Sequence, residues 1–454
     1  MKEVRKMNTD QLTVLTIKHL KDGKRIALRE TLEELHPYDF AELYRALPEK
    51  HHYKFLSFLT SKQIADLMME LDQEMQMEVL QKLGIEKSSK VMDIMDNDDL
   101  ADLLSEISEE KLEEYLSAMQ KEESKTVQQL MSYPPETAGG IMTDEFVWIR
   151  DYYTVRDAVE KFKSFAEFTR NIYYLYVIDE NKKLVGVVSY RDLLLADTNE
   201  RIGDIMFSRV ISVPLTMDQE EVAQLIQRYD FLAVPVVDEK NHLKGIVTVD
   251  DVIDVFIEEA NEDIEKLSAS GKAIDFNTKA VVASYRRLPW LVLLLFIGLI
   301  TGSILDGFEQ TLEQVVALIF FMPMIAGMTG NTGTQSLAVV VRGLVTTTME
   351  KNTVLKLIWR ELKVGIIIGI TCGALVFIVA SLWQSDIIFG TIVGVSLLAT
   401  LIIGTLAGTI IPLILYHFGV DPAVASGPLI TTLNDIFSLL IYFGIATSLL
   451  HHLV

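Results

Sequence analysis

An acidic residue, Asp435, interrupts an apolar stretch near the C-terminus that is long enough to cross a bilayer. A charge in hydrocarbon costs about 3 kcal/mol or more on insertion scales, so such residues usually mark an ion path or a proton relay. Thr431, Thr432 and Asn434 lie just before it. We expect Asp435 to be the only carboxylate at membrane depth and predict that it holds a permeating cation. A proton relay or a hydrogen-bonded helix clamp is the alternative.

A second apolar stretch contains a polar run, and residues 323–336 read PMIAGMTGNTGTQS. Gly and Pro loosen a helix, and non-helical backbone at membrane depth is tolerated only when it is buried or lines a wet cavity. Close helix packing would explain Gly327 and Gly330, but it does not explain the polar residues around Asn331. We therefore predict an interrupted span that forms a pore wall. The predicted lining residues are Asn331, Thr431, Thr432 and Asn434.

One carboxylate is a poor cation site, whereas a two-fold dimer would bring two copies of Asp435 face to face. Two facing carboxylates suit a hard divalent cation. Mg²⁺ prefers six oxygen ligands and loses water reluctantly, so we expect it to pass with waters retained.

Acidic residues also gather ahead of the membrane half. Asp251, Asp254, Glu258 and Glu262 are spaced three or four apart, so one helix face carries four negative charges. Like charges at that spacing destabilise a helix by a few tenths of a kcal/mol per pair, which bound cations would relieve. A second cluster, residues 96–99 with Asp102, lies earlier; Asp96 there is also explained as a helix cap.

The composition separates a charged half from an apolar half. Residues 1–284 contain 34 of the 41 basic and 55 of the 63 acidic residues, and therefore nearly all of the net charge of −22. Such a surface repels nucleic acid and attracts cations. The single Cys372 excludes a disulfide framework. No signal peptide precedes the charged half, so we expect it to remain cytoplasmic.

Five apolar segments follow, at about 288–306, 313–343, 361–383, 387–416 and 426–450, each near the ~20 residues that a spanning helix needs. All seven basic residues from Arg286 onward fall before the first segment or around the loop between the second and third. The positive-inside rule puts that side, and the charged half, in the cytoplasm of a cell-membrane protein.

Residues 177–193 and 236–252 are an internal repeat with a spacing of 59 residues. Each copy reads strand, turn, Gly, strand and then Ser/Thr-x-x-Asp, where the hydroxyl is expected to cap a helix. Helices are predicted upstream at 154–165 and 218–229. This repeat resembles a tandem pair of cystathionine-β-synthase (CBS) domains. In residues 1–133, related five-residue segments at Asp39, Gln63 and Asp99 predict stacked short helices in a superhelix.

The GNTGTQS and PLITTLND motifs, the PPETAGGIMT junction at 134–143 and the CBS pair together resemble the MgtE family of magnesium channels. The resemblance covers the whole chain and implies a multidomain membrane protein. Its expected parts are an all-α superhelical N-domain at 1–133, an α/β tandem CBS pair at 134–258 (134–202 and 203–258), a connecting helix at 259–284 and a five-helix transmembrane domain at 285–454.

The resemblance implies a homodimer that imports Mg²⁺ and that cytosolic Mg²⁺ closes. Asp435 would hold the ion in the pore. The implied regulatory ligands are Asp98, Asp102, Glu220, Asp230, Asp251, Asp254, Glu259, Glu262, Asp263 and Asp421. ATP or another adenylate is a candidate ligand of the CBS pair, because the Ser/Thr-x-x-Asp element holds an adenosine ribose in some of its relatives.

Two other function classes compete with a passive channel. An ion-coupled secondary transporter of divalent cations would use Asp435 as a carrier site, and the lack of a second membrane carboxylate counts against it. A non-conducting Mg²⁺ receptor would not need polar membrane spans. No nucleotide-hydrolysing loop occurs, so neither an enzyme nor a primary pump is expected.

Overall fold

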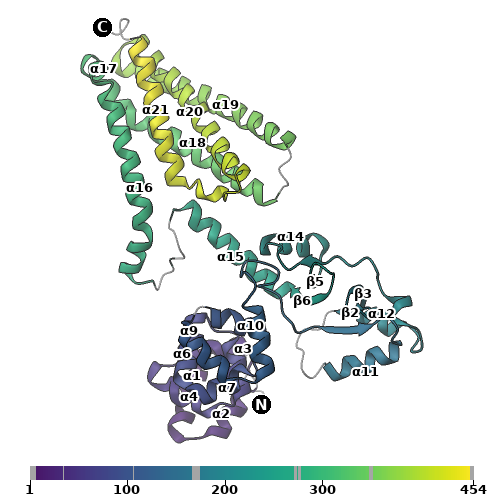
Figure 1. Cartoon of the computed structure of the whole chain (residues 1–454). Helices are drawn as coiled ribbons and strands as arrows, with labels where there is room; N and C mark the ends of the chain where they lie inside the picture. Colours follow the sequence, from purple (N-terminus) through teal and green to yellow (C-terminus); the bar gives the residue numbers. More distant parts are fainter. Residues whose placement is uncertain are drawn as a thin grey trace. The chain divides into compact units, whose positions relative to one another are not determined.

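The chain forms two compact units, Met1–Phe256 and Ile257–Val454, whose elements are labelled in Figure 1. This computed structural model describes residues 7–33, 35–105, 107–165, 174–269, 274, 278–346 and 351–449.

Short helices stacked in two rows build the N-terminal part of the first unit. Their bounds are α1 Thr9–Asp22, α2 Arg25–Leu32, α3 Pro37–Ala46, the 3₁₀ turn η2 Glu49–His51, α4 His52–Phe58, α5 Ser61–Met68, α6 Gln73–Leu83, α7 Ile85–Met92, α8 Asn97–Ser105, α9 Glu109–Ala118 and α10 Lys121–Leu130. Each helix packs against the next but one, so odd-numbered and even-numbered helices form separate rows. The predicted stack of short helices is confirmed, and its superhelical winding stays a prediction.

Local signals account for several of these helix starts. Asn8 and Thr60 each form a capping box with the glutamine three residues on, and the Asp72 side chain accepts from the Met75 N–H. A cap of this kind stabilises a helix by about 1 kcal/mol. The apolar faces then meet in a core that includes Leu28, Leu43 and Phe55.

Two three-stranded sheets follow, one for each copy of the sequence repeat. The first copy contains β1 Val147–Arg150, α11 Val155–Phe165, β2 Tyr174–Ile178, β3 Leu184–Ser189, α12 Tyr190–Leu195 and α13 Ile202–Ile205. The second contains β4 Val213–Pro214, α14 Gln219–Tyr229, β5 Ala233–Val237, β6 Leu243–Thr248 and α15 Val249–Leu267. In each sheet the first two strands are parallel and the last two antiparallel. The predicted upstream helices are confirmed, and Ser189 caps α12 as expected.

The segment before each module pairs with the sheet of the other module. The Thr143 N–H donates to the Ile246 carbonyl at 2.8 Å, and the Phe207 N–H donates to the Val187 carbonyl at 2.9 Å. Gly245 is needed for this exchange, because a Cβ there would lie 2.7 Å from the Met142 sulfur. The exchange fastens the two modules together.

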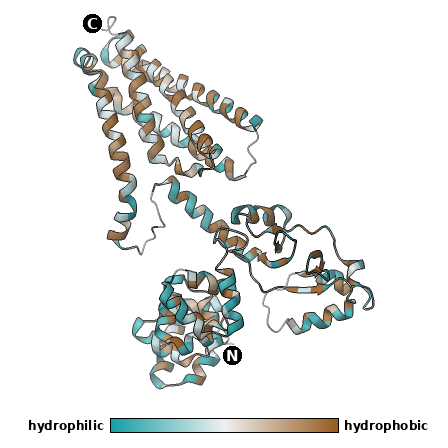
Figure 2. Cartoon of the chain, viewed as in Figure 1, coloured by the Kyte–Doolittle hydropathy of each residue, from teal (hydrophilic) through white to brown (hydrophobic). Residues whose placement is uncertain are grey.

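Long helices make up the second unit, together with the last part of α15. They are α16 Ala280–Asp306, α17 Glu309–Gln314, α18 Leu318–Thr346, α19 Lys351–Gln384, α20 Ile387–His417, the turn η3 Pro422–Val424 and α21 Gly427–Ser448. Figure 2 shows apolar residues dominating α16, α19 and α20. Within the described residues, α16, α19, α20 and α21 are long and apolar enough to cross a membrane.

α18 corresponds to the second predicted span, 313–343, and it is not among these four helices, because polar residues replace apolar ones over 329–336. The predicted interruption is wrong, because α18 is one continuous helix of 29 residues with Pro323 inside it. Pro323 lies in the second turn of α18, where it removes one backbone hydrogen bond of the helix without ending it. The Thr329 and Thr332 hydroxyls donate to the carbonyls of Ile325 and Met328 four residues earlier, so the polar run satisfies itself within the helix.

Candidate ion pathway and acidic surfaces

The polar residues of α18 and α21 meet inside the membrane unit. Asn434 is fully buried, and its Nδ2 donates to the Thr329 carbonyl of α18 at 3.4 Å. A Cβ at Gly333 would clash with that same Nδ2, and one at Gly330 would lie 2.9 Å from the Thr431 side chain. The glycines of the GNTGTQS motif therefore let α21 approach α18 closely enough for Asn434 to bond backbone.

Asp435, one residue further along α21, is only half-buried in the single chain, and Asn331 is exposed on α18. The Thr431 and Thr432 hydroxyls donate to the carbonyls of Gly427 and Pro428 at 2.8 Å, which leaves their oxygens as acceptors. Asp435 and Asn331 therefore remain accessible to a cation or to a second copy of the chain. Asn434 is buried and is not accessible. The assignment of all five residues to the pore stays a prediction.

The membrane unit also contains a buried carboxylate that is not among the predicted site residues. It is Glu361 on α19, which is 5% exposed. The expectation that Asp435 is the only carboxylate at membrane depth stays a prediction. Glu361 is the first residue of the predicted span 361–383 and was given no role. Its spacing of four residues from Gly365, Gly369 and Gly373, which are all buried on α19, is the signal that could have revealed it.

In the first unit, Asp98 of α8 and Asp251 of α15 are brought together. The Thr143 hydroxyl donates to Asp98 Oδ1 at 3.2 Å, and Asn97 Nδ2 donates to Asp144 Oδ1 at 3.1 Å. The Thr248 hydroxyl donates to Asp251 Oδ2 within the second Ser/Thr-x-x-Asp element. Burial, reinforced by Asp99 and Asp251, raises the pKa of Asp98 well above its usual value, and burial raises the pKa of Asp251 to about 6. Two carboxylates so placed repel each other unless a proton or a cation intervenes.

These pKa shifts predict that protons promote contact between the N-domain and the second CBS module. A carboxyl group whose pKa is raised in the contact stabilises that contact below its free pKa of about 4, and the stabilisation is lost as pH rises through the raised value. For Asp251 the stabilisation is lost between about pH 4 and its raised pKa of about 6. Without divalent cations, fluorescence transfer between labels at Ser117→Cys and Glu239→Cys, in a Cys372→Ser chain, should be higher at pH 5 than at pH 7.5. Transfer that ignores pH, or that keeps its pH dependence when Asp98 and Asp251 are both Asn, would contradict this.

The other predicted regulatory acids of the first unit lie apart from this pair. Asp102 is exposed on α8 and Asp254 is exposed on α15. Glu220 lies in the first turn of α14 and accepts from Gln224 Nε2 at 3.2 Å. Asp230 ends α14 in a left-handed conformation at φ 52°.

In the second unit, the end of α15 meets the turn before α21. Lys266 Nζ lies 2.5 Å from both Glu262 Oε1 and Asp421 Oδ2. Asp263 is half-buried beside them, and burial together with the Asp421 charge raises its pKa. The hydrogen bonds of Asp421 raise the pKa of Lys266 against the effect of burial, which keeps the ammonium charged. Glu259 lies one helical turn before Glu262 and Asp263. The Lys266 ammonium is thus the cation around which Glu262, Asp263 and Asp421 gather.

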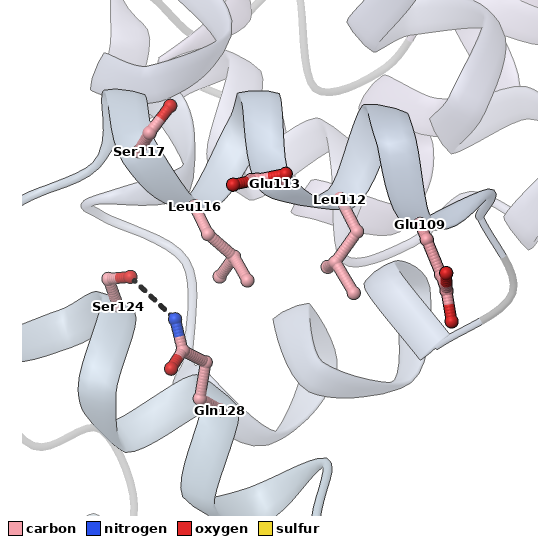
Figure 3. Close-up of a pocket in the computed structure, with 7 residues that line it drawn as sticks. All are labelled: Glu109, Leu112, Glu113, Leu116, Ser117, Ser124 and Gln128. Carbon is pink, nitrogen blue, oxygen red and sulfur yellow. Dashed lines mark hydrogen bonds between the residues drawn. The ribbon is translucent and has the colours of Figure 1, made fainter.

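Among the described residues, no group of three or more His, Cys, Asp or Glu side chains has the spacing of a metal site. Figure 3 shows a depression in the N-domain whose lining includes Leu112 and Leu116 of α9 and Ser124 and Gln128 of α10. None of the predicted site residues lines it.

A membrane unit with polar helices at its centre, joined to a CBS pair and a helical domain, defines a membrane transport protein with an attached soluble half. Residues 322–445 match the family model MgtE, described as a divalent cation transporter, and residues 35–136 match the MgtE intracellular N domain. Residues 138–199 and 202–258 match the CBS domain.

The chain is 58% identical to the magnesium transporter MgtE of Bacillus subtilis (strain 168), over 99% of this chain and all of the relative. It therefore belongs to the MgtE family, as the resemblance indicated, and this is a family of transporters rather than of enzymes.

Two solved structures match the first unit. One is the soluble part of a magnesium transporter, at 39% identity and a TM-score of 0.54, covering 56% of this chain and all of that one. The other is the cytosolic domain of the Mg²⁺ channel MgtE in complex with ATP, at 38% identity and a TM-score of 0.51, covering 54% of this chain and 99% of that one. The predicted N-domain and CBS pair are thereby confirmed.

Proposed function

We propose that this protein is a Mg²⁺ channel of the cell membrane that imports Mg²⁺ and that cytosolic Mg²⁺ closes. The observation that carries the proposal is the polar contact between α18 and α21, which leaves the Asp435 carboxylate half-buried on a spanning helix. The magnesium transporters among its relatives support Mg²⁺ as the ion.

The pore requires two copies of the chain. A single Asp435 contributes one carboxylate, and hydrated Mg²⁺ needs several outer-sphere oxygens around it. In a two-fold homodimer, Asp435 and Asn331 from each copy would face one another, with the Thr431 and Thr432 oxygens as further acceptors. The basic residues near α18 and α19 put the soluble half on the cytoplasmic side.

Closure follows from the repulsion between acidic groups. Asp98 and Asp251 approach each other in a buried setting at a cost, and Mg²⁺ between or beside them would remove it. One helix, α15, carries Asp251 and Asp254 in the first unit and Glu262 and Asp263 in the second. A cation that neutralises either set therefore changes the charge along the same helix. The remaining ligands in this proposal are Asp102, Glu220, Asp230, Glu259 and Asp421.

Lys266 at the end of α15 competes with Mg²⁺ for the same carboxylates. Its ammonium already bridges Glu262 and Asp421, so Mg²⁺ must displace it or bind the outer oxygens of the same carboxylates. The link between α15 and the turn before α21 is then present at low Mg²⁺ and is strengthened when the divalent ion binds.

ATP is proposed as a second ligand of the CBS pair. The related cytosolic domain solved with ATP supports this, as do the two Ser/Thr-x-x-Asp elements. Asp192 in the first element is exposed, whereas Asp251 in the second is half-buried beside Asp98. The Ser189–Asp192 element is therefore the more accessible place for a ribose.

Current recording from the purified protein in lipid separates a channel from an ion-coupled transporter. With no proton or sodium gradient, a Mg²⁺ gradient alone should drive current, and raising Mg²⁺ on the cytosolic side should stop it. A flux that requires a proton or sodium gradient would favour the coupled transporter, for which Glu361 offers a further carboxylate in the membrane unit. Current unchanged by cytosolic Mg²⁺ would remove the proposed gate.

A further inference from the structure

Glu361 is a buried carboxylate that neither the proposed pore nor the acidic surfaces use. Its oxygens are shared between two partners. The Ser336 hydroxyl of α18 donates to Oε2 at 3.1 Å, and the Arg360 guanidinium donates to Oε1 at 3.1 Å and 2.9 Å. Arg360 remains 56% exposed, while Glu361 is 6% exposed at its side chain. A buried carboxylate is costly unless it is paired and hydrogen-bonded, so its retention inside the bundle requires a reason.

The packing of α19 against α20 holds Glu361 in place. Gly365, Gly369 and Gly373 lie on the same face of α19 as Glu361, and a Cβ on them would come within 2.8 to 3.2 Å of α20 atoms. Glycines at every fourth position allow the two helices this close approach. Because α19 cannot shift easily along so tight a contact, the position of Glu361 is well defined. A hydrogen bond to Glu361 can therefore fix the position of α18.

α18 needs such support. It carries Pro323, Gly327, Gly330 and Gly333, and both residue types lower the intrinsic stability of a helix. Asn434 and Glu361, from two other helices, hydrogen-bond to it around its polar motif. Asn434 of α21 binds the Thr329 carbonyl, and Glu361 of α19 accepts from Ser336, about 10 Å further along the axis at 1.5 Å per residue. The segment that contains Asn331 lies between these two contacts.

We infer that Glu361 is a positioning residue for ion passage, which fixes the rotation of α18 through Ser336 and so sets where Asn331 faces. This inference rests on the proposed pore. Arg360 pairs with Glu361 Oε1 from the surface, and a hydroxyl binds a carboxylate that has such a partner more strongly than it binds a neutral acceptor.

The test compares Glu361→Gln, Ser336→Ala and the double variant in the full-length protein in lipid, with Lys363→Gln as control. Lys363 is an exposed charge on the same helix. Each single variant should lower Mg²⁺ flux about tenfold, because it removes the hydrogen bond between Ser336 and Glu361 that holds α18. The double variant should lose little more than either single variant, because both remove the same contact. Lys363→Gln should match the wild type.

A labelling measurement separates positioning from simple stabilisation. In a Cys372→Ser background, the rate at which a thiol reagent modifies Asn331→Cys should change severalfold when Glu361→Gln or Ser336→Ala is added, and not with Lys363→Gln. Unchanged labelling and flux in folded variants would overturn the inference, as would additive losses that follow only a lower melting temperature. If Glu361→Gln does not fold, Ser336→Ala tests the same contact.

Asp435→Ala in the same preparation tells the two claims apart. If it removes flux while the Glu361 and Ser336 variants match the wild type, the positioning role fails and the pore stands. If Asp435→Ala conducts normally, the proposed pore itself fails.

Discussion

Replacing Asp435 with Ala should nearly abolish Mg²⁺ flux while the protein still folds and is purified at normal yield. Asp435 is half-buried on α21, and among the described residues Asn434, not Asp435, makes the side-chain hydrogen bond from α21 to the Thr329 carbonyl of α18. The loss of Asp435 therefore removes charge from the ion route without opening the helix packing. Losing one partner of a desolvated charge interaction costs about 2 to 5 kcal/mol, which is a loss of roughly thirtyfold to several thousandfold.

The measurement is Mg²⁺ uptake into proteoliposomes, with melting temperature as a check on folding. Glu313→Ala is a matched control, because Glu313 is an exposed carboxylate of the same unit on α17. Asp435→Asn separates charge from shape and should lose nearly as much flux as Asp435→Ala. Wild-type flux in both variants would place the permeation site elsewhere.

The triple variant Asp251→Ala, Asp254→Ala and Asp263→Ala should conduct and should need far more cytosolic Mg²⁺ to close. Moving a two-state gate from 1:99 to 99:1 takes about 5.5 kcal/mol of differential binding, which several weak sites must supply together. These three carboxylates lie along α15, and Asp251 and Asp263 already have pKa values raised by burial. Removing them takes away carboxylates that would bind Mg²⁺ in the closed arrangement, so each Mg²⁺ concentration favours closure less than in the wild type.

The expected result is a shift of about tenfold or more in the Mg²⁺ concentration that halves the current, the range of ordinary coupling energies. A control with Glu160, Glu180 and Glu239 changed to Ala removes three exposed charges from the CBS pair and should close like the wild type. An inhibition curve that overlays the wild type in the α15 variant would show that these acids are not part of the gate.

The sequence by itself determined the parts of this protein. The spacing of apolar residues was enough to predict the stacked helices of the N-domain, because helix caps and apolar helix faces are encoded by residues close in sequence. The 59-residue repeat was enough to predict two equivalent modules, because the same order of strand, turn, Gly and strand recurs in each copy. The apolar spans were also predictable, because the hydropathy of a segment is a local property. The prediction overestimated the effect of the glycines and Pro323 on the continuity of α18. That helix is continuous because threonine hydroxyls and neighbouring helices satisfy and support it.

Only the tertiary structure decided which of the many polar residues meet. No pattern pairs Asp98 with Asp251, Lys266 with Asp421, or Ser336 with Glu361, because the members of each pair lie on different elements. Glu361 is the clearest case. In sequence it follows Arg360 and resembles an ordinary charge at a membrane surface, but the tight packing of α19 on α20 turns it inward. Burial depends on what covers a residue, and the covering helices come from distant parts of the chain.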